Sequence, residues 1–497
     1  MPLKWTRRSV VTRMGALAVP VLMPSAAGVG AAQLAVDPSA RGEKRPEKSK
    51  RGDGQVTDKV FLNRPNVIVI VTDDMRASDW VALPETQRLI GDRGTVFPNF
   101  ILNTPVCGPS RATLFTGKLP RNHGVLENNE ADGDAWTSMM AGPGKRGTIY
   151  NEAQKAGYRT GLVGKFLNGA PPSGRIAPGF DRWYSTSELD YYDFELNENG
   201  ITQKYAGNAY STDVLADHAV AFIEETPAEQ PFLLFFTPKA PKGPATPSAK
   251  YVTAFPDAQA RRTPAWNETD ITDKPESVRR RDPLSRQDVS EMDDKERRRL
   301  QTLLSVDDAI GLIWRSLRRT NREDNTIIMV MSDNGYAIGE HLLDGKGRPY
   351  DEMVRVPMMA FGPGFEAGGV DERMVSMADI APTLKHAMSV GLQDVDGASL
   401  LDDWTREYVP IETPGGKQAY WALRGRDELY VEYDDGEREY YDYLADPYEL
   451  DNQLADWDGQ SPTLDPVRAE DLAARLQEFR VCSGKSCRGT VALASPA

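Results

Sequence analysis

The sequence predicts an α/β fold built around a large, mostly parallel sheet. Two continuous apolar runs, residues 66–71 and 326–331, carry that prediction because they are rich in β-branched side chains. Such runs are typical of strands buried on both faces of a parallel sheet. Shorter apolar runs at 160–163 and 232–236 have the same character. Each run leads into polar or charged residues, and ligands of open α/β sheets bind at the carboxyl ends of the strands.

The composition is that of a soluble globular protein, with 40% hydrophobic and 27% charged residues. Its 497 residues are ample for a large core and for more than one domain. The 73 acidic side chains outnumber the 59 basic ones, which gives a net charge of -14. This charge, together with the lack of a basic stretch interleaved with aromatic residues, argues against nucleic-acid binding.

The amino-terminal residues 1–35 are predicted to be an export signal. Basic residues precede an apolar run at 14–23, which is too short to span a bilayer. The pair Arg7-Arg8 favours the twin-arginine route, with an ordinary secretory signal as the alternative. Residues 36–60 are charged and weakly apolar, which predicts a disordered linker. We therefore expect an exported protein, secreted or held in the cell envelope, without a later membrane span.

Polar residues at the ends of the two long apolar runs suggest a metal site. Asp73 and Asp74 follow the first run, and Asp333 and Asn334 follow the second. Adjacent carboxylates beside a buried strand are costly unless something neutralises them. Either pair alone would also suit a turn or a helix cap. If the two strands are neighbours, all four side chains converge, and oxygen ligands of this kind suit Ca²⁺ or Mg²⁺.

Of the three cysteines, Cys107 stands alone, whereas Cys482 and Cys487 lie close enough in sequence to pair. Pro109 suits the first turn of a helix. Cys107 would then lie at a helix amino terminus, where backbone N–H groups and the helix dipole favour an anion. A buried structural cysteine is the alternative interpretation.

The string CGPSRATLFTGKLPRNHGV, residues 107–125, resembles the signature of the type I sulfatases. In that family a formylglycine-generating enzyme oxidises the cysteine of Cys-x-Pro-x-Arg to formylglycine (3-oxoalanine). The resemblance extends from about residue 66 to residue 488. It is strongest to the branch that includes N-acetylglucosamine-6-sulfatase and the heparan 6-O-endosulfatases.

The resemblance implies an alkaline-phosphatase-like sandwich with a mixed, mostly parallel central sheet flanked by helices. This catalytic domain would span residues 61–395. A smaller carboxy-terminal α+β subdomain with an antiparallel sheet would span residues 396–497.

Local patterns predict several elements outside the central strands. Alternating residues at 429–433 and 438–443 predict two antiparallel strands joined by a turn. A helix is expected over 296–318, preceded by a long polar excursion at 245–300. Asp465-Pro466 predicts the start of a last helix that continues to Phe479.

The resemblance also implies the residues of the site. The metal ligands would be Asp73, Asp74, Cys107, Asp333 and Asn334, with Ca²⁺ as the ion and Mg²⁺ as the alternative. The catalytic residues would be Cys107, Arg111, His123, Lys165, Lys242, His341 and Lys346. His218 and His386 are predicted to be structural.

One position departs from the family pattern. The family's Ala-Pro-His segment here reads Ala240-Pro241-Lys242, so a lysine replaces the histidine that is thought to protonate the leaving alcohol. Lysine can bind sulfate as a point charge. Its ordinary pKa of about 10.4 makes it a poor acid near neutrality. Two outcomes are expected as alternatives: turnover is slow, or His341 takes the acid role.

The resemblance implies hydrolysis of sulfate monoesters, with a sulfated amino sugar or polysaccharide as the expected substrate and aryl sulfates as test substrates. One hydroxyl of hydrated formylglycine would attack sulfur, and the other would then expel sulfate. Arg111 and His123 would hold and deprotonate the hydrate. Two alternatives are a phosphoester hydrolase of the same fold group and a sulfated-glycan-binding protein with weak turnover.

Overall fold

The computed structural model describes residues 64–492, except for 131–132, 146, 172, 187–189, 357 and 416–417. The predicted export signal (1–35) and linker (36–60) lie outside the described residues. The described residues all fall within one compact unit. Among them, no helix combines the length and the apolar character that crossing a bilayer requires.

The predicted α/β fold is confirmed. Among the described residues, ten strands form one sheet in the order β15-β2-β14-β11-β1-β10-β6-β7-β8-β9. The central pairs β11·β1, β1·β10 and β10·β6 are parallel, whereas β14 and β8 run antiparallel to their neighbours. The strands are β1 (Asn66–Thr72), β2 (Thr95–Phe97), β6 (Arg159–Gly164), β7 (Arg182–Ser185), β8 (Phe194–Glu198), β9 (Ile201–Tyr205), β10 (Phe232–Thr237), β11 (Thr326–Ser332), β14 (Met358–Phe361) and β15 (Gly369–Val370).

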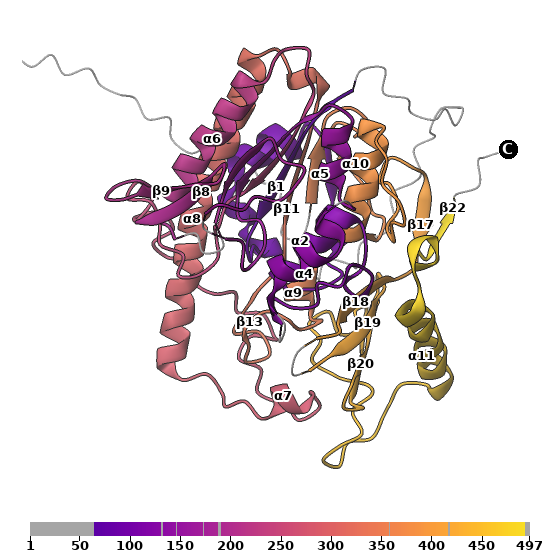
Figure 1. Cartoon of the computed structure of the whole chain (residues 1–497). Coiled ribbons are helices and arrows are strands. Elements are labelled where there is room, and N and C mark those ends of the chain that lie inside the picture. Colours follow the sequence, from indigo (N-terminus) through magenta and orange to yellow (C-terminus); the bar gives the residue numbers. More distant parts are fainter. Residues whose placement is uncertain are drawn as a thin grey trace, which may run out of the picture. The chain divides into compact units, whose positions relative to one another are not determined.

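Helices cover both faces of this sheet (Figure 1). On one face, Val67 and Val69 of β1 belong to a core that includes residues of α2 (Cys107–Thr116), α4 (Ala135–Ala141), α5 (Ile149–Lys155) and α10 (Ile380–Met388). On the other, α6 (Ser211–Glu225) and α8 (Arg286–Arg319) pack against Ile68 and Ile70. Successive residues of a strand point to opposite faces. A continuous apolar run is therefore required to fill both cores.

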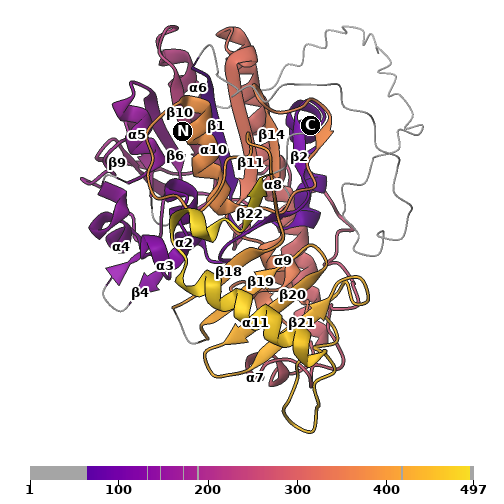
Figure 2. The ribbon, with the colours of Figure 1, turned by 90° about the vertical axis from the view of Figure 1, so that its right-hand side faces the viewer.

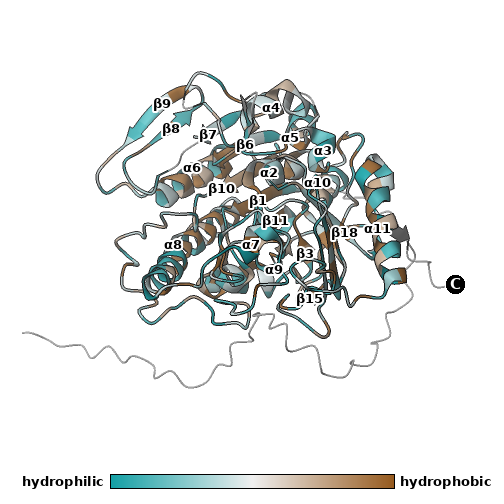
Figure 3. Cartoon of the chain, turned by 90° about the horizontal axis from the view of Figure 1, so that it is seen from below, coloured by the Kyte–Doolittle hydropathy of each residue, from teal (hydrophilic) through white to brown (hydrophobic). Residues whose placement is uncertain are grey.

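The long helix α8 begins ten residues before the predicted residue 296. Ser285 accepts a hydrogen bond from the Asp288 N–H, and Asp288 accepts one from the Ser285 N–H, which forms a capping box. The first turns of α8 consist mostly of charged and polar residues. Farther along the helix, hydrophilic residues alternate with apolar ones (Figure 3). The prediction of a polar excursion is therefore wrong for residues 286–295, because the helix starts at this cap and not at the first apolar residues.

The carboxy-terminal sheet has the order β18 (Val409–Thr413), β19 (Tyr420–Arg424), β20 (Glu428–Tyr433) and β21 (Arg438–Asp442), and it is antiparallel throughout. Helix α11 (Pro466–Val481) lies across it (Figure 2). Its Leu472 and Leu476 pack against Leu423 and Tyr430. Cys482 and Cys487 form the predicted disulfide after this helix.

The remaining elements among the described residues are short. They are η2 (Ala77–Ala82), α1 (Pro84–Thr86), η3 (Gln87–Gly91), β3 (Phe100–Ile101), α3 (Pro120–His123), β4 (Asn129–Glu130), β5 (Gly133–Asp134), η4 (Pro143–Lys145), α7 (Glu276–Arg279), η5 (Glu323–Asn325), β12 (Ala337–Ile338), β13 (Asp344–Gly345), α9 (Asp351–Val354), β16 (Val375–Ser376), η6 (Met377–Asp379), β17 (Trp404–Arg406), η7 (Gly484–Cys487) and β22 (Thr490–Ala492).

A buried ion pair joins the last part of the chain to the central layers. Arg406 of β17 donates two hydrogen bonds of 2.7 and 2.8 Å to Asp379 of η6. Asp379 also accepts from the N–H groups of Ser376 and Ala398. The side-chain exposures of Asp379 and Arg406 are 0% and 2%. The boundary predicted at residues 395/396 stays a prediction, and this pair bridges it.

We predict that Asp379→Ala destabilises the protein by about 3–5 kcal/mol, because Arg406 is then left buried without its partner. Urea unfolding followed by circular dichroism measures the change. The matched control is Glu195→Ala, which removes an exposed pair with Lys204 and is expected to cost about 1 kcal/mol or less. Equal effects of the two substitutions would contradict the role given to the buried pair.

Candidate active site

The acidic residues that follow β1 and β11 lie side by side. The two strands are parallel neighbours, with Thr72 opposite Ser332. Asp74 donates its N–H to Asp333 Oδ1 at 3.2 Å. Asn334 Nδ2 donates to Asp74 Oδ1 at 2.7 Å. Because the register is held by the whole length of both strands, the carboxylates are brought together by the sheet itself.

Cys107 enters this group from the start of α2. It is buried and unpaired, and its Sγ lies 3.4 Å from Asp73 Oδ1. The next residue, Gly108, donates its N–H to Asn128 Oδ1 at 2.7 Å. A Cβ on Gly108 would lie 2.7 Å from Ala135 Cβ, so the close packing of this turn excludes a larger residue. Burial raises the pKa of the Cys107 thiol, and the nearby Asp73 adds to that effect.

Three lysines from separate segments surround Asp73 and Cys107. Lys165, after β6, donates to Asp73 Oδ2 at 2.6 Å. Lys242, beyond β10, lies 3.7 Å from Asp73 Oδ1 and 3.9 Å from Cys107 Sγ. Lys346 contacts Cys107 and lies 3.1 Å from the oxygen of the Asn334 side-chain amide. Burial alone would raise the pKa of Asp73, but these lysines lower it well below its ordinary value.

Arg111 links Asp333 to the backbone of Lys165. Its Nε donates to Asp333 Oδ2 at 2.8 Å, and its Nη1 donates to the Lys165 carbonyl at 2.7 Å. The side chain is 1% exposed. The planar guanidinium, with its several donors in a fixed geometry, suits simultaneous bonds to a carboxylate and to a backbone carbonyl.

The donor atoms fit a hard divalent cation. Ligand atoms of Asp73, Asp74, Cys107 and Asp333 all lie within 4.8 Å of one another, and the Asn334 amide adjoins them. Three carboxylates and an amide oxygen are the ligands that Ca²⁺ and Mg²⁺ prefer. The Lys346 ammonium lies among Asp74, Asn334 and Cys107, which indicates that these atoms favour a positive group.

His123 lies against α2. Its Nδ1 accepts from the Val125 N–H at 3.1 Å, so Nε2 carries the ring proton and donates to Thr113 Oγ1 at 3.1 Å. Burial lowers the pKa of His123 to about 3, and the imidazole is therefore neutral. Both ring nitrogens of His123 are therefore occupied by hydrogen bonds, to Thr113 and to Val125.

His341 is placed in a different group of side chains. Its Nδ1 lies 2.7 Å from Glu268 Oε2, and its Nε2 lies 3.7 Å from Glu449 Oε2. Burial would lower the pKa of His341, but the two glutamates raise it to about 10. The potential metal-ligand atoms that lie close to His341 belong to Glu352 and Glu449, whereas Cys107 belongs to the other group. The structure therefore does not bring His341 together with the other predicted catalytic residues.

The other two histidines lie elsewhere. His218 of α6 stacks on Tyr184 at 4.0 Å between ring centroids. His386 of α10 contacts Ser399 Oγ at 3.2 Å.

Sequence reasoning missed Arg299. This residue of α8 donates to the carbonyl of Asp74 at 2.6 Å and to Asp79 Oδ2 at 2.7 Å. Asp74 has a φ of 71°, a left-handed conformation that is uncommon outside glycine, so its backbone benefits from this support. The sequence feature that could have revealed it is the position of this arginine beside the buried Leu300 in α8.

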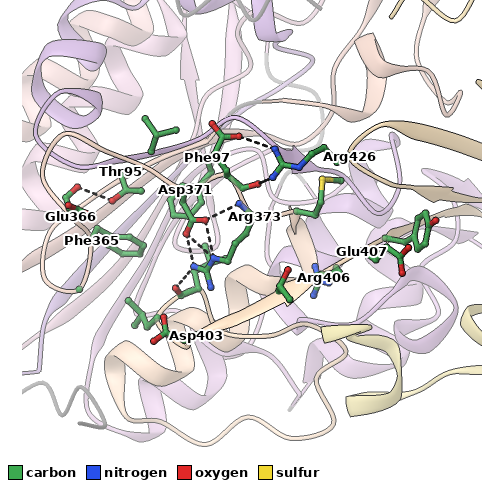
Figure 4. Close-up of a pocket in the computed structure, with 18 of the residues that line it drawn as sticks. Thr95, Phe97, Phe365, Glu366, Asp371, Arg373, Asp403, Arg406, Glu407 and Arg426 are labelled. Carbon is green, nitrogen blue, oxygen red and sulfur yellow. Dashed lines mark hydrogen bonds and ion pairs between the residues drawn. The ribbon is translucent and has the colours of Figure 1, made fainter. Parts of the chain in front are cut away.

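A cavity of about 770 Å³ lies between the edge of the central sheet and the carboxy-terminal subdomain (Figure 4). Within the described chain, its lining includes none of the predicted site residues. Arg373 donates to Asp371 at 2.9 Å, and Arg426 lies 3.3 Å from Glu372. Since these arginines already face carboxylates, the cavity is poorly suited to an anionic ester.

Comparison with known proteins identifies the family. The family model described as Sulfatase matches residues 65–390. The chain is 30% identical over 486 residues to human N-acetylglucosamine-6-sulfatase, covering 86% of this chain and 86% of that protein. It is 35% identical over 349 residues to a Sulf-1 homolog of Caenorhabditis elegans, covering 68% of this chain but only 48% of that protein. The chain therefore belongs to the sulfatase family, a class of sulfuric ester hydrolases.

Solved structures share the fold. One is described as a complex with its substrate D-glucosamine-2-N,6-O-disulfate. It aligns with a TM-score of 0.68 at 24% identity, covering 84% of this chain and 98% of that one. A phosphonate monoester hydrolase of Agrobacterium radiobacter aligns with a TM-score of 0.66 at 20% identity, covering 86% of this chain and 100% of that one. At such identities the likeness shows the fold alone, which sulfatases share with a phosphonate hydrolase.

We predict that Asp333→Asn lowers the affinity for Ca²⁺ by roughly tenfold or more, because it removes a charged ligand and the partner of Arg111. Equilibrium dialysis with metal analysis measures the bound ion. The control is Asp308→Asn, which alters a partly exposed carboxylate paired with Lys250. Unchanged Ca²⁺ binding by the Asp333 variant would contradict the assignment of the metal ligands.

Proposed function

We propose that this protein hydrolyses sulfate monoesters of a sulfated amino sugar or polysaccharide. One observation carries the proposal: Cys107 of the sulfatase signature lies at the start of α2, in contact with Asp73 and beside Lys242 and Lys346. The substrate class is supported by the name of the human relative, N-acetylglucosamine-6-sulfatase, and by the substrate described for the solved structure.

Formylglycine at position 107 would supply the nucleophilic hydroxyl group, and a Ca²⁺ ion, with Mg²⁺ as the alternative, would draw charge from the sulfate oxygens. The ion would be held by Asp73, Asp74, Asp333, Asn334 and position 107. This proposal includes maturation by a formylglycine-generating enzyme.

The surrounding cations bind and orient the sulfate group. Lys242 and Lys346 reach Cys107 from different segments, so they would contact different sulfate oxygens. Arg111 keeps Asp333 in place. His123 has no free lone pair, because Nδ1 accepts from Val125 and Nε2 carries the proton. We therefore assign His123 a positioning role under the first turns of α2 rather than the role of a base.

Lys242 is suited to binding charge and not to donating a proton. Burial lowers its pKa, but Asp73 and Cys107 outweigh that effect and raise the pKa above its ordinary value. An acid with so high a pKa transfers its proton reluctantly near neutral pH. We therefore assign no donor role to His341, because it faces Glu268 and Glu449.

We also propose that the protein is exported, with the twin-arginine route as the predicted path. The predicted signal at residues 1–35 supports this proposal. So does a Drosophila melanogaster relative that is named an extracellular sulfatase.

We predict that residue 107 loses its sulfur atom when the protein is produced together with the formylglycine-generating enzyme. Mass spectrometry of the peptide that contains residue 107 measures this loss. That protein should release sulfate from 4-nitrophenyl sulfate and from a sulfated glucosamine, whereas Cys107→Ala should release none. An intact thiol in active protein would overturn the formylglycine mechanism.

The same assay separates the two alternative functions. A phosphoester hydrolase would cleave 4-nitrophenyl phosphate faster than the sulfate ester. A sulfated-glycan-binding protein would retain its ligand without releasing sulfate.

We predict that Lys242→His raises kcat for substrates with a poor leaving alcohol, since an imidazole is a better acid near neutrality than this lysine. Rates for 4-nitrophenyl sulfate, which has a good leaving group, should change much less. Lys239→His is the control, because Lys239 lies in the same segment but pairs with Asp190. Equal effects on good and poor leaving groups would contradict an acid role at position 242.

A further inference from the structure

A second set of metal-type ligand atoms lies outside the catalytic cluster. His341, Glu352 of α9 and Glu449 each offer one atom, and these three atoms lie within 4.8 Å of one another. His341 precedes the loop strand β13, whereas Glu449 follows β21 in the carboxy-terminal subdomain. The segment that carries His341 and Glu352 thus meets a distant part of the chain, which carries Glu449.

The ring of His341 is oriented as in a metal-binding histidine. Its Nδ1 lies 2.7 Å from Glu268 Oε2, and since a carboxylate only accepts, Nδ1 carries the proton. Its Nε2 is buried and has no hydrogen-bond partner within the described chain. The distance of 3.7 Å from Nε2 to Glu449 Oε2 is too long for a hydrogen bond. Metal-bound histidines characteristically donate their other ring N–H to a carboxylate, as His341 does to Glu268.

The two glutamates are also positioned as ligands. Glu449 is 1% exposed, and its Oε1 accepts from the Tyr443 hydroxyl at 2.5 Å. Both of its oxygens lie 3.2 Å from the Asp351 N–H, which fixes the carboxylate beside His341. Glu352 Oε2 is buried and, among the described residues, lacks a hydrogen-bond partner.

A histidine held as a cation between two carboxylates is the simpler account of this cluster. That account leaves the Nε2 proton without an acceptor at hydrogen-bond distance, and it leaves Glu352 Oε2 unsatisfied. A buried polar atom without a partner is costly. A divalent ion among the three side chains would satisfy all of these atoms and would balance the two carboxylates.

We propose that His341, Glu352 and Glu449 bind a divalent transition-metal ion of the Zn²⁺ class. One imidazole nitrogen with two carboxylate oxygens suits such an ion, whereas Ca²⁺ prefers oxygen ligands alone. A small cavity of about 60 Å³ is lined by Glu352 together with Arg261 and Tyr448.

The ion is structural and acts on the loop that carries Lys346. His341 lies five residues before that lysine, and Glu449 lies in the carboxy-terminal subdomain. His341 and Glu449 have φ values of 51° and 55°, left-handed conformations that side chains seldom adopt. A metal bond between them ties the loop to the subdomain and stabilises both conformations.

The experiment is a Zn²⁺ titration of the full chain, purified without a histidine tag and saturated with Ca²⁺ to occupy the catalytic site. Calorimetry and metal analysis should find one Zn²⁺ per chain. His341→Gln should abolish this binding, and Glu268→Gln should weaken it by about 10–100-fold. His218→Gln is the matched control, since His218 also lies near a carboxylate, at 3.5 Å from Glu198, and should leave Zn²⁺ binding unchanged.

Three results would overturn the proposal. The first is that the Ca²⁺-saturated wild type binds no Zn²⁺, and the second is that His341→Gln binds it as tightly as the wild type. The third is loss of Zn²⁺ in Asp333→Asn with retention in His341→Gln, which would place the ion in the catalytic cluster. Should His341→Gln not fold, the isosteric Glu352→Gln decides: Zn²⁺ should raise the melting temperature of the wild type but not that of this variant.

Discussion

The structure depends on the neutralisation of three carboxylates buried at the ends of two parallel strands. Asp73 and Asp333 are fully buried and Asp74 nearly so. Isolated charges of this kind would be very costly in the interior. Their partners Arg111, Lys165, Lys242 and Lys346 come from four separate segments. The fold can bury the carboxylates only when the sheet, α2 and three loops are all in place.

The sheet gives this arrangement its precision. Parallel pairing of β1 with β11 over seven residues places the two strand ends together, and a slip of one residue would turn every side chain of β1 to the opposite core. The two cores differ in their partners, since Val69 faces α2 and Ile70 faces α8. The packing of apolar residues thus fixes the positions of the acidic ones.

Much of the fold and most of the candidate site could be predicted from the sequence, because both depend on local signals. Continuous apolar runs marked β1, β6, β10 and β11, and Asp465-Pro466 marked the start of α11. The short strands β15, β2 and β14, which form one side of the sheet, could not be found, because two to four residues carry no readable periodicity. Arg299 and Glu268 escaped notice because their roles arise from partners more than 70 residues away in sequence. His341 was assigned by its sequence neighbours, whereas its environment is set by Glu268 and Glu449.

The lysine at position 242 changes how the site uses its charge. A neutral histidine there would leave Lys165, Lys346 and Arg111 as the positive groups, whereas Lys242 adds a fixed charge near Asp73 and Cys107. A point charge attracts the sulfate group of the bound ester and the free sulfate product alike. Interactions that are equally strong before and during the reaction favour binding without raising the rate of the chemical step. We therefore propose that Lys242 favours the binding of sulfated ligands at low concentration. In this proposal no side chain protonates the leaving alcohol, so the rate depends on how good a leaving group the alcohol of the substrate is.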